Sequence, residues 1–225
     1  MAGQNLSFGV LLLPNFQWLD ACGPVDYINN HSQAMLKFLQ QPDETISKGP
    51  IITWHYISTD LMPVRASSGP LMIPSTTYAD CPPLDYLIVP GPDPTVPLPE
   101  ACSAFLKAHF PELRNLLLVC TASMAVAQTG ILDGLQVCTN KMALKMVAQA
   151  GMHNRNVKWV RDRRWVVDGK VWSSAGVTSG LDMAVEFAKV MFDPVPVALT
   201  REMLEYQARE AQPDPFAYIL EGFEL

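Results

Sequence analysis

One cysteine stands where a buried strand is predicted to turn into a helix, and this position could make its sulfur a nucleophile. Residues 116–119 are four apolar residues suited to a buried strand, Cys120 follows at once, and residues 121–127 are small or apolar residues at helical spacing. Open α/β sheets place ligands at the carboxyl edge of their strands. The positive end of the following helix favours a thiolate over a thiol. The spacing therefore predicts that Cys120 is a nucleophile with a lowered pKa; a buried structural thiol is the alternative.

The other residues that commonly carry chemistry form no comparable cluster. Four histidines, at positions 31, 55, 109 and 153, lie far apart in the sequence. They show no metal-ligand spacing, so we expect no metal site.

The predicted elements alternate between strands and helices, which predicts an α/β fold with a mostly parallel sheet and helices on both faces. We expect strands at residues 6–13, 51–58, 86–89, 116–119, 159–168 and 170–174, two short strands within 63–78, and a hairpin turn at 168–169. We expect helices at residues 20–40, 100–110, 122–129, 141–150, 178–191 and about 200–209, the first with Gly23-Pro24 at its entry. No linker interrupts the pattern, so we expect one domain over residues 1–225, with a core at about 6–192 and a helical tail at 193–225.

Composition narrows the classes of function. The chain has 225 residues, 49% of them hydrophobic and 17% charged, and a net charge of −6, as in a globular protein with a buried core. The sequence contains no basic stripe, which argues against nucleic acid as a partner, and no apolar run near the roughly 20 residues of a membrane helix. The N-terminus has no positive signal segment, and five cysteines without paired spacing fit a reducing compartment. We expect a cytoplasmic protein with no membrane partner.

Several motifs in chain order resemble those of one family. They are LLP at 12–14 with LDACGP at 19–24, DYLIVPG at 85–91, VCTAS at 119–123 and SAGVTSGLD at 174–182. Together they resemble the ThiJ/PfpI superfamily, which has a class I glutamine amidotransferase-like fold. The isonitrile hydratase branch is most similar, because it also has stretches like ASSG at 66–69 and YADCPPLD at 78–85. The resemblance covers about residues 6–192.

The resemblance implies a flavodoxin-like three-layer sandwich, usually a homodimer, that acts on a small molecule without a metal or organic cofactor. It implies Cys120 as the nucleophile at a sharp elbow, Asp20 as the acid beside it, and Thr121 as a backbone N–H donor to developing negative charge. We expect the substrate to contact Gly91, Pro92, Phe16, Trp18 and Ala122, with Met124 and Met142 as further walls of a roomy apolar pocket.

A carboxyl group beside a thiolate works best when burial and the sulfur's charge raise its pKa, because it can then donate a proton. Isonitrile hydration needs such a pair: the thiolate adds to the carbon, Asp20 protonates the adduct, and water displaces sulfur to leave an N-substituted formamide. Capping of the first helix is the structural alternative for Asp20.

Two positions depart from the family pattern. Many members carry a histidine about twenty residues after the cysteine, where this chain reads VCTNK at 137–141. Pro92 replaces a glycine of the usual oxyanion turn, and proline has no N–H to donate.

Other functions stay open at this point. The same Cys/Asp pair would serve a glutathione-independent glyoxalase or a natural-product tailoring enzyme, although glyoxalase chemistry usually uses the missing histidine. A non-enzymatic redox sensor is a third possibility, since exposed thiolates oxidise readily. A DNA-binding regulator is disfavoured, because the tail after residue 192 is too short for an appended helix-turn-helix module.

Overall fold

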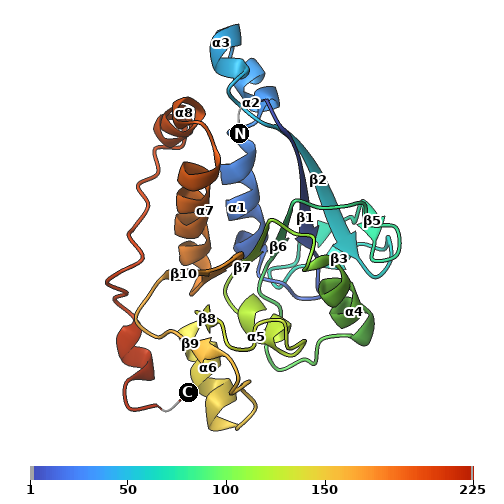
Figure 1. The fold of residues 1–225 in the computed structure, drawn as a ribbon. Coiled ribbons are helices and arrows are strands. Elements are labelled where there is room, and N and C mark those ends of the chain that lie inside the picture. The colour runs from blue at the N-terminus through green and yellow to red at the C-terminus, as the bar shows by residue number, and fades with distance from the viewer. Residues whose placement is uncertain (1–2, 224) are drawn as a thin grey trace.

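The computed structural model describes residues 3–223 and 225, and it is built around a central sheet of mixed but mostly parallel strands (Figure 1). The sheet order is β10-β11-β7-β6-β1-β2-β5, and only the β10–β11 pair is antiparallel. The strands are β1 (Asn5–Leu11), β2 (Ile51–Ser58), β5 (Thr76–Thr77), β6 (Tyr86–Val89), β7 (Asn115–Leu118), β10 (Trp165–Asp168) and β11 (Val171–Ser174). The predicted α/β fold class is confirmed.

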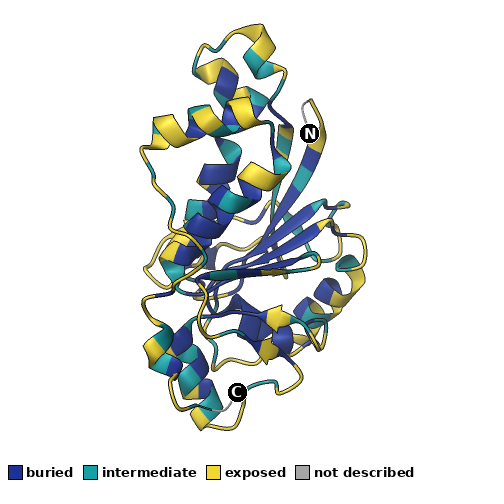
Figure 2. Cartoon of the chain, turned by 60° about the vertical axis from the view of Figure 1, so that its left-hand side comes forward, coloured by how far each residue is buried: buried dark blue, intermediate teal, exposed yellow. Residues whose placement is uncertain are grey.

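Helices cover both faces of this sheet, so the central strands are buried on both sides (Figure 2). On one face, α1 (Trp18–Asn29) and α7 (Val177–Met191) pack against alternate residues of β1 such as Phe8 and Val10. On the other face, α4 (Glu100–His109), α5 (Ala122–Ala127) and α6 (Lys141–Gln149) pack over Leu11 and its neighbours. Strands buried on both faces are uniformly apolar, which is why residues 116–119 could be recognised from the sequence.

The strand order fixes where a site can form. The chain passes from β1 to β2 on one side and later returns to β6 on the other side of β1. The carboxyl ends of β1 and β6 therefore flank a switch point, where ligands bind in open α/β sheets. Asp20 lies in the first turn of α1, which follows β1, and Gly91 and Cys120 lie in the turns after β6 and β7, so the topology brings these three residues together.

Two predicted elements are each divided in two in the structure. The expected helix at 20–40 is α1 followed by α2 (Gln33–Phe38), because the Ser32 hydroxyl caps α2 by accepting the Met35 N–H at 3.3 Å. The first helix begins at Trp18, so Pro24 lies inside it and not at its entry. The expected strand at 159–168 is β9 (Lys158–Trp159), which pairs with β8 (Gln136–Val137), and then β10.

The tail packs back onto the domain through buried ion pairs. It contains α8 (Pro194–Leu204), which starts earlier than the helix predicted near 200–209, and the short 3-10 helix η1 (Ala217–Leu220). Asp214 of the tail pairs with Lys141 at the start of α6, and both side chains are buried. Earlier in the tail, Tyr206 donates to Asp182 at 2.5 Å, and Asp182 also pairs with Arg164.

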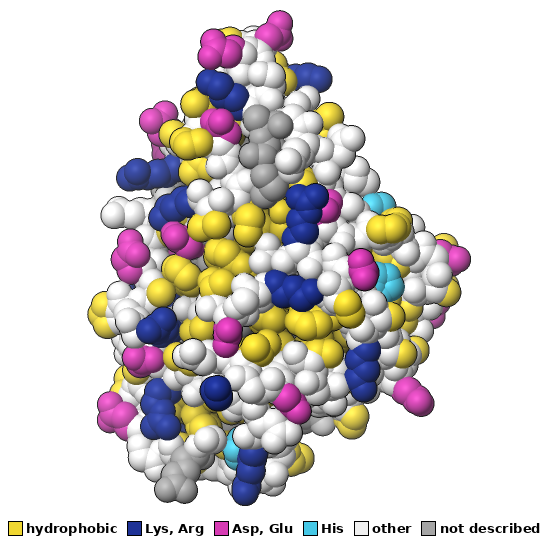
Figure 3. All heavy atoms as spheres, in the orientation of Figure 1, with side chains coloured by type: hydrophobic (Ala, Val, Ile, Leu, Met, Phe, Trp, Pro, Cys, Tyr) yellow, Lys and Arg dark blue, Asp and Glu magenta, His cyan; other side chains and the backbone are white. Residues whose placement is uncertain are grey.

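The remaining elements are short. They are α3 (Asp43–Ile46) and the antiparallel strands β3 (Val64–Arg65) and β4 (Leu71–Met72). The β3–β4 pair confirms the two strands predicted within residues 63–78. Among the described residues, no helix is long and apolar enough to cross a membrane. No group of three or more His, Cys, Asp or Glu side chains in the same residues could hold a metal ion. Figure 3 shows Lys and Arg side chains scattered among Asp and Glu on the face drawn there, not gathered in one basic patch.

Candidate active site

Cys120 occupies a sharp turn between β7 and α5. Its φ is 60°, in the left-handed region that non-glycine residues seldom adopt and that often marks functional sites. Its carbonyl oxygen accepts hydrogen bonds from the Thr139 hydroxyl at 2.6 Å and from the Asn140 backbone N–H at 3.4 Å. These bonds hold the turn in its unfavourable conformation and fix the direction of the sulfur.

Asp20 lies in the first turn of α1 and its side chain is fully buried. Its Oδ2 accepts the Gly91 N–H at 3.0 Å, whereas no hydrogen-bonding partner within 3.5 Å is found for Oδ1 among the described nitrogen and oxygen atoms. Burial raises the pKa of Asp20 from 3.8 to about 7, and the hydrogen bonds from Gly91 and, more weakly, from Cys120 oppose that rise. A carboxyl with a pKa near neutrality can both accept and donate a proton during a reaction.

Gly91 explains how closely these groups approach. A Cβ atom built at this position would lie 2.5 Å from Thr121 Oγ1 and 2.8 Å from Asp20 Oδ2. No real Cβ tolerates such contacts, so only glycine allows the loop after β6 to pass between the carboxyl and the elbow. The glycine of the DYLIVPG motif is therefore required by contact and not by its φ angle.

The sulfur of Cys120 has two donors and one acid around it. Asn140 Nδ2 lies 3.6 Å from Sγ, and the Thr121 N–H also lowers the pKa of the thiol. Burial and the nearby Asp20 charge outweigh both and raise the pKa of Cys120 to about 12. The expectation of a lowered pKa is wrong, because Cys120 is only 6% exposed and α5 has only six residues.

Asn140 is the residue that the sequence analysis missed as a member of the site. Its Oδ1 caps α6 by accepting the Ala143 N–H at 3.1 Å, which leaves its NH₂ group facing the sulfur. It follows Cys120 by twenty residues, at the place where many family members have histidine. The spacing of twenty residues from Cys120 is the sequence signal that places Asn140 where the histidine usually lies.

Pro92 and Thr121 join the loop after β6 to the elbow. The Thr121 hydroxyl donates to the Pro92 carbonyl at 2.6 Å. Pro92 has no N–H, and the Gly91 N–H is already given to Asp20. The backbone donor that remains at the elbow is the Thr121 N–H, which faces the sulfur.

A shallow pocket of about 390 Å³ opens over this group. Its walls are Asn15, Gln17, Ser67, Gly91, Pro92, Asp93, Cys120 and Thr121. Three of the expected contact residues do not line it: Phe16 and Ala122 are fully buried in the core, and Trp18 packs beside Phe16 with their ring centroids 6.2 Å apart. The predicted apolar pocket does not form around Phe16 and Trp18, because Met124 and Met142 line two separate hollows.

Comparisons with known proteins show which family the chain resembles in sequence. The model of the DJ-1/PfpI family matches residues 10–190. The chain is 30% identical over 203 residues to the isonitrile hydratase of Pseudomonas putida, covering 89% of this chain and 78% of that protein. It is 27% identical over 181 residues to the HTH-type transcriptional regulator GbdR of Pseudomonas aeruginosa, covering 79% of this chain and 44% of the regulator.

Solved structures show the same fold at lower identity. A THiJ/PfpI family protein from Pseudomonas syringae has a TM-score of 0.70 and 21% identity, covering 96% of this chain and 78% of that one. Drosophila melanogaster DJ-1beta has a TM-score of 0.67 and 15% identity, covering 91% of this chain and 100% of that one.

Proposed function

The chain belongs to the DJ-1/PfpI family, and we propose that it hydrates an isonitrile to an N-substituted formamide, with Cys120 as nucleophile and Asp20 as proton carrier. The observation that carries this proposal is the buried Cys120–Asp20 pair, with Asn140 beside the sulfur in place of a histidine. The 30% identity to an isonitrile hydratase supports the same chemistry.

The pair holds one shared proton over a wide pH range. The pKa values of about 7 for Asp20 and about 12 for Cys120 belong to a coupled pair. Between them the pair carries one proton, which rests on sulfur and can move to the carboxylate. That transfer creates the thiolate and the protonated acid at the same moment, next to each other. A neutral, weakly polar electrophile suits this arrangement.

Hydration then proceeds in three steps, after which Cys120 and Asp20 have regained their starting protonation states. The sulfur bonds to the isonitrile carbon, and the thiol proton passes through Asp20 to that carbon, which gives a thioimidate. Asp20 next takes a proton from water as the water oxygen adds to the carbon, and the nitrogen receives that proton. The carbon–sulfur bond breaks as the hydroxyl proton passes through Asp20 to sulfur, which releases the formamide. No step builds a full oxyanion, so the chemistry tolerates the missing N–H of Pro92.

The test is formamide production from an alkyl or aryl isonitrile, followed by mass spectrometry. We expect formamide from the wild type, none from Cys120→Ala, and a wild-type rate from Cys22→Ala, a cysteine two residues from Asp20 in sequence that lies outside the pocket. The value of kcat/KM should rise about tenfold per pH unit below pH 7 and level off above it, as the pair loses its first proton. Absence of formamide, or an active Cys120→Ala variant, would reject the proposal.

The competing functions fit this site less well. Redox sensing needs a reactive thiolate, whereas burial raises the pKa of Cys120 to about 12. Release of lactate from methylglyoxal would favour the glyoxalase alternative, and the same assay plate can include it. A homodimer and a cytoplasmic location stay predictions; the five cysteines, all unpaired, support the second.

A further inference from the structure

The loop after β6 forms a strap, residues 92–98, that is fastened to α5 at both ends. Thr121 donates to the Pro92 carbonyl at 2.6 Å, and Leu98 donates its N–H to Gln128 Oε1 at 2.9 Å. Between these anchors, the hydrogen bonds found among the described residues stay within the strap, as when the Thr95 N–H and hydroxyl both reach Asp93. The middle of the strap is therefore held to the protein by its ends.

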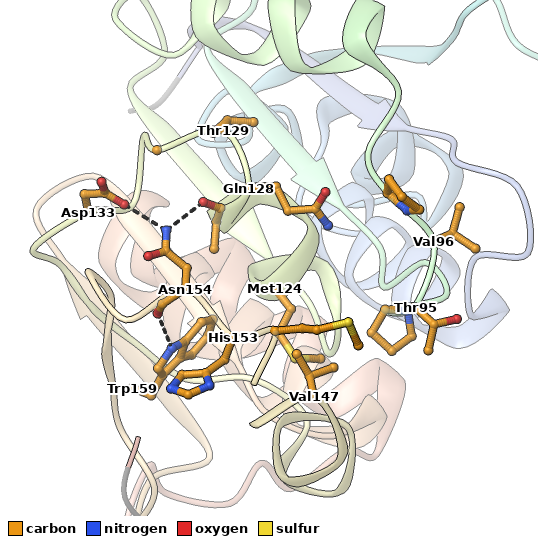
Figure 4. Close-up of a pocket in the computed structure, with 15 residues that line it drawn as sticks. Thr95, Val96, Met124, Gln128, Thr129, Asp133, Val147, His153, Asn154 and Trp159 are labelled. Carbon is orange, nitrogen blue, oxygen red and sulfur yellow. Dashed lines mark hydrogen bonds between the residues drawn. The ribbon is translucent and has the colours of Figure 1, made fainter. Parts of the chain in front are cut away.

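A cavity of about 570 Å³ lies behind this strap (Figure 4). We call it the back cavity. Its apolar walls include Met124 of α5, Val147 of α6 and Trp159 of β9, and the strap supplies two prolines and Val96. Its volume and mixture of apolar walls with a few polar groups are typical of small-molecule sites.

The back cavity adjoins the candidate active site on two sides. Asp93 borders the pocket over Cys120, and the next residue, Pro94, borders the back cavity. Thr121, the N-cap residue of α5, borders the pocket over Cys120, and Met124, three residues later in α5, borders the back cavity. A substrate whose reacting carbon lies at Cys120 can thus extend along α5, toward Gln128, by displacing the middle of the strap.

The charges around the cavity restrict what it can hold. Among the described residues that line it, Asp133 carries the one carboxylate, and the lining includes no Lys or Arg. Asp133 is already engaged, since its two oxygens accept from Asn154 at 2.9 Å and Asn156 at 3.0 Å. An anionic group would find no Lys or Arg side chain in this lining, where His153 is the basic side chain, and burying it would carry a high desolvation cost. The lining favours a neutral, largely apolar group that stacks on Trp159.

We propose that the back cavity holds the substituent of the substrate, and that this substituent is bulky, uncharged and aromatic or otherwise apolar. The inference rests on the proposed hydration of an isonitrile, and it names the class of isonitrile. Small alkyl isonitriles would occupy only the pocket over Cys120. Isonitriles with a carboxylate on the substituent would be excluded.

The kinetic test compares methyl isonitrile with a biphenylmethyl isonitrile. Met152 lines the cavity and is 63% exposed, so Met152→Trp narrows the cavity without disturbing the core. We expect at least a tenfold rise in KM for the biphenylmethyl substrate and no change for methyl isonitrile. Met146→Trp is the matched control, because Met146 is exposed on α6 and does not line the cavity. Equal effects of Met152→Trp on both substrates would overturn the inference.

A binding test separates this inference from the proposed function. N-(biphenylmethyl)formamide is titrated into the Cys120→Ala variant while tryptophan fluorescence is followed. We expect saturable quenching that is lost in the Cys120→Ala, Trp159→Phe double variant and absent with N-methylformamide. Quenching without any hydration of isonitriles by the wild type would reject the proposed function and leave the cavity as a ligand site. Hydration of both isonitriles without quenching would reject the cavity and leave the function.

Discussion

Replacing Asp20 with asparagine should stabilise the protein in alkaline solution. The native state holds this carboxyl at a pKa of about 7 where an unfolded chain holds it at 3.8. Between these values the native state binds more protons than the unfolded state, so the free energy of unfolding falls as pH rises and reaches its full loss above pH 7. At 1.36 kcal/mol per pKa unit, the raised pKa of this fully buried carboxyl lowers the free energy of unfolding by about 4 kcal/mol in all. About 3 kcal/mol of this loss falls between pH 5 and pH 8.

The assay is urea unfolding of wild type and Asp20→Asn at pH 5 and pH 8. Asparagine keeps an acceptor for the Gly91 N–H but has no charge to bury. The free energy of unfolding of the wild type should therefore fall by about 3 kcal/mol more than that of the variant between the two pH values. Any pH-independent cost of the substitution cancels in this double difference. Parallel loss of stability in the two proteins would refute the assignment of a raised pKa to Asp20 and, with it, the shared-proton mechanism.

Three further outcomes follow from the site and the core. Asn140→Ser keeps a capping side chain for α6 but removes the amide donor to the sulfur, so the pKa of Cys120 should rise and its thiolate should become scarcer. Peptide-resolved alkylation at a fixed alkaline pH should be slower at Cys120 in the variant, and an equal rate would show that the 3.6 Å contact does not stabilise the thiolate. Gly91→Ala should lower the free energy of unfolding by about 1–3 kcal/mol through overpacking and abolish turnover by displacing Asp20. Thermal unfolding and the formamide assay measure the two effects, and an active, stable variant would show that a Cβ at this position does not displace Asp20. His31 is fully buried with Nε2 unpartnered among the described residues, and burial lowers its pKa to about 4. Below pH 6.5 the unfolded state binds one more proton at His31 than the native state, so the free energy of unfolding should fall less in His31→Leu than in the wild type between pH 6 and pH 4. Urea unfolding at both pH values measures this difference, and an equal fall in the two proteins would show that His31 can be protonated in the fold without cost.

The fold was predictable because its signals are local. Apolar runs at residues 86–89 and 116–119 identify strands buried on both faces, and the Gly169 turn identifies the last hairpin. The break between α1 and α2 was harder, since helical spacing continues through it and only the Ser32 cap marks it. Such a cap competes with continuation of the helix, and spacing alone does not decide between them.

The site was predictable only in part, because its members are joined by the sheet and not by the sequence. Cys120 and Asp20 were named from motifs, and the structure brings both to the switch point. The pKa of the thiol was predicted in the wrong direction, since burial is a tertiary property that a strand–helix boundary does not report. The role of Asn140 was not predictable for a similar reason: the hydrogen bond by which its Oδ1 caps α6 orients its amide, and that bond forms only in the fold.

The ion pair between Lys141 and Asp214 connects the tail to the start of α6, beside the candidate active site. The family match ends at residue 190, yet Lys141 is the neighbour of Asn140 in sequence and is buried with Asp214 as its counter-ion. Cutting the chain at the family boundary would leave that ammonium with the Arg163 carbonyl as its hydrogen-bond acceptor, and breaking a buried pair costs about 3–5 kcal/mol. The unpaired charge would lie on Lys141, one residue from Asn140, whose amide faces the sulfur. A shortened chain would retain every family motif and leave the buried Lys141, the sequence neighbour of Asn140, without its counter-ion.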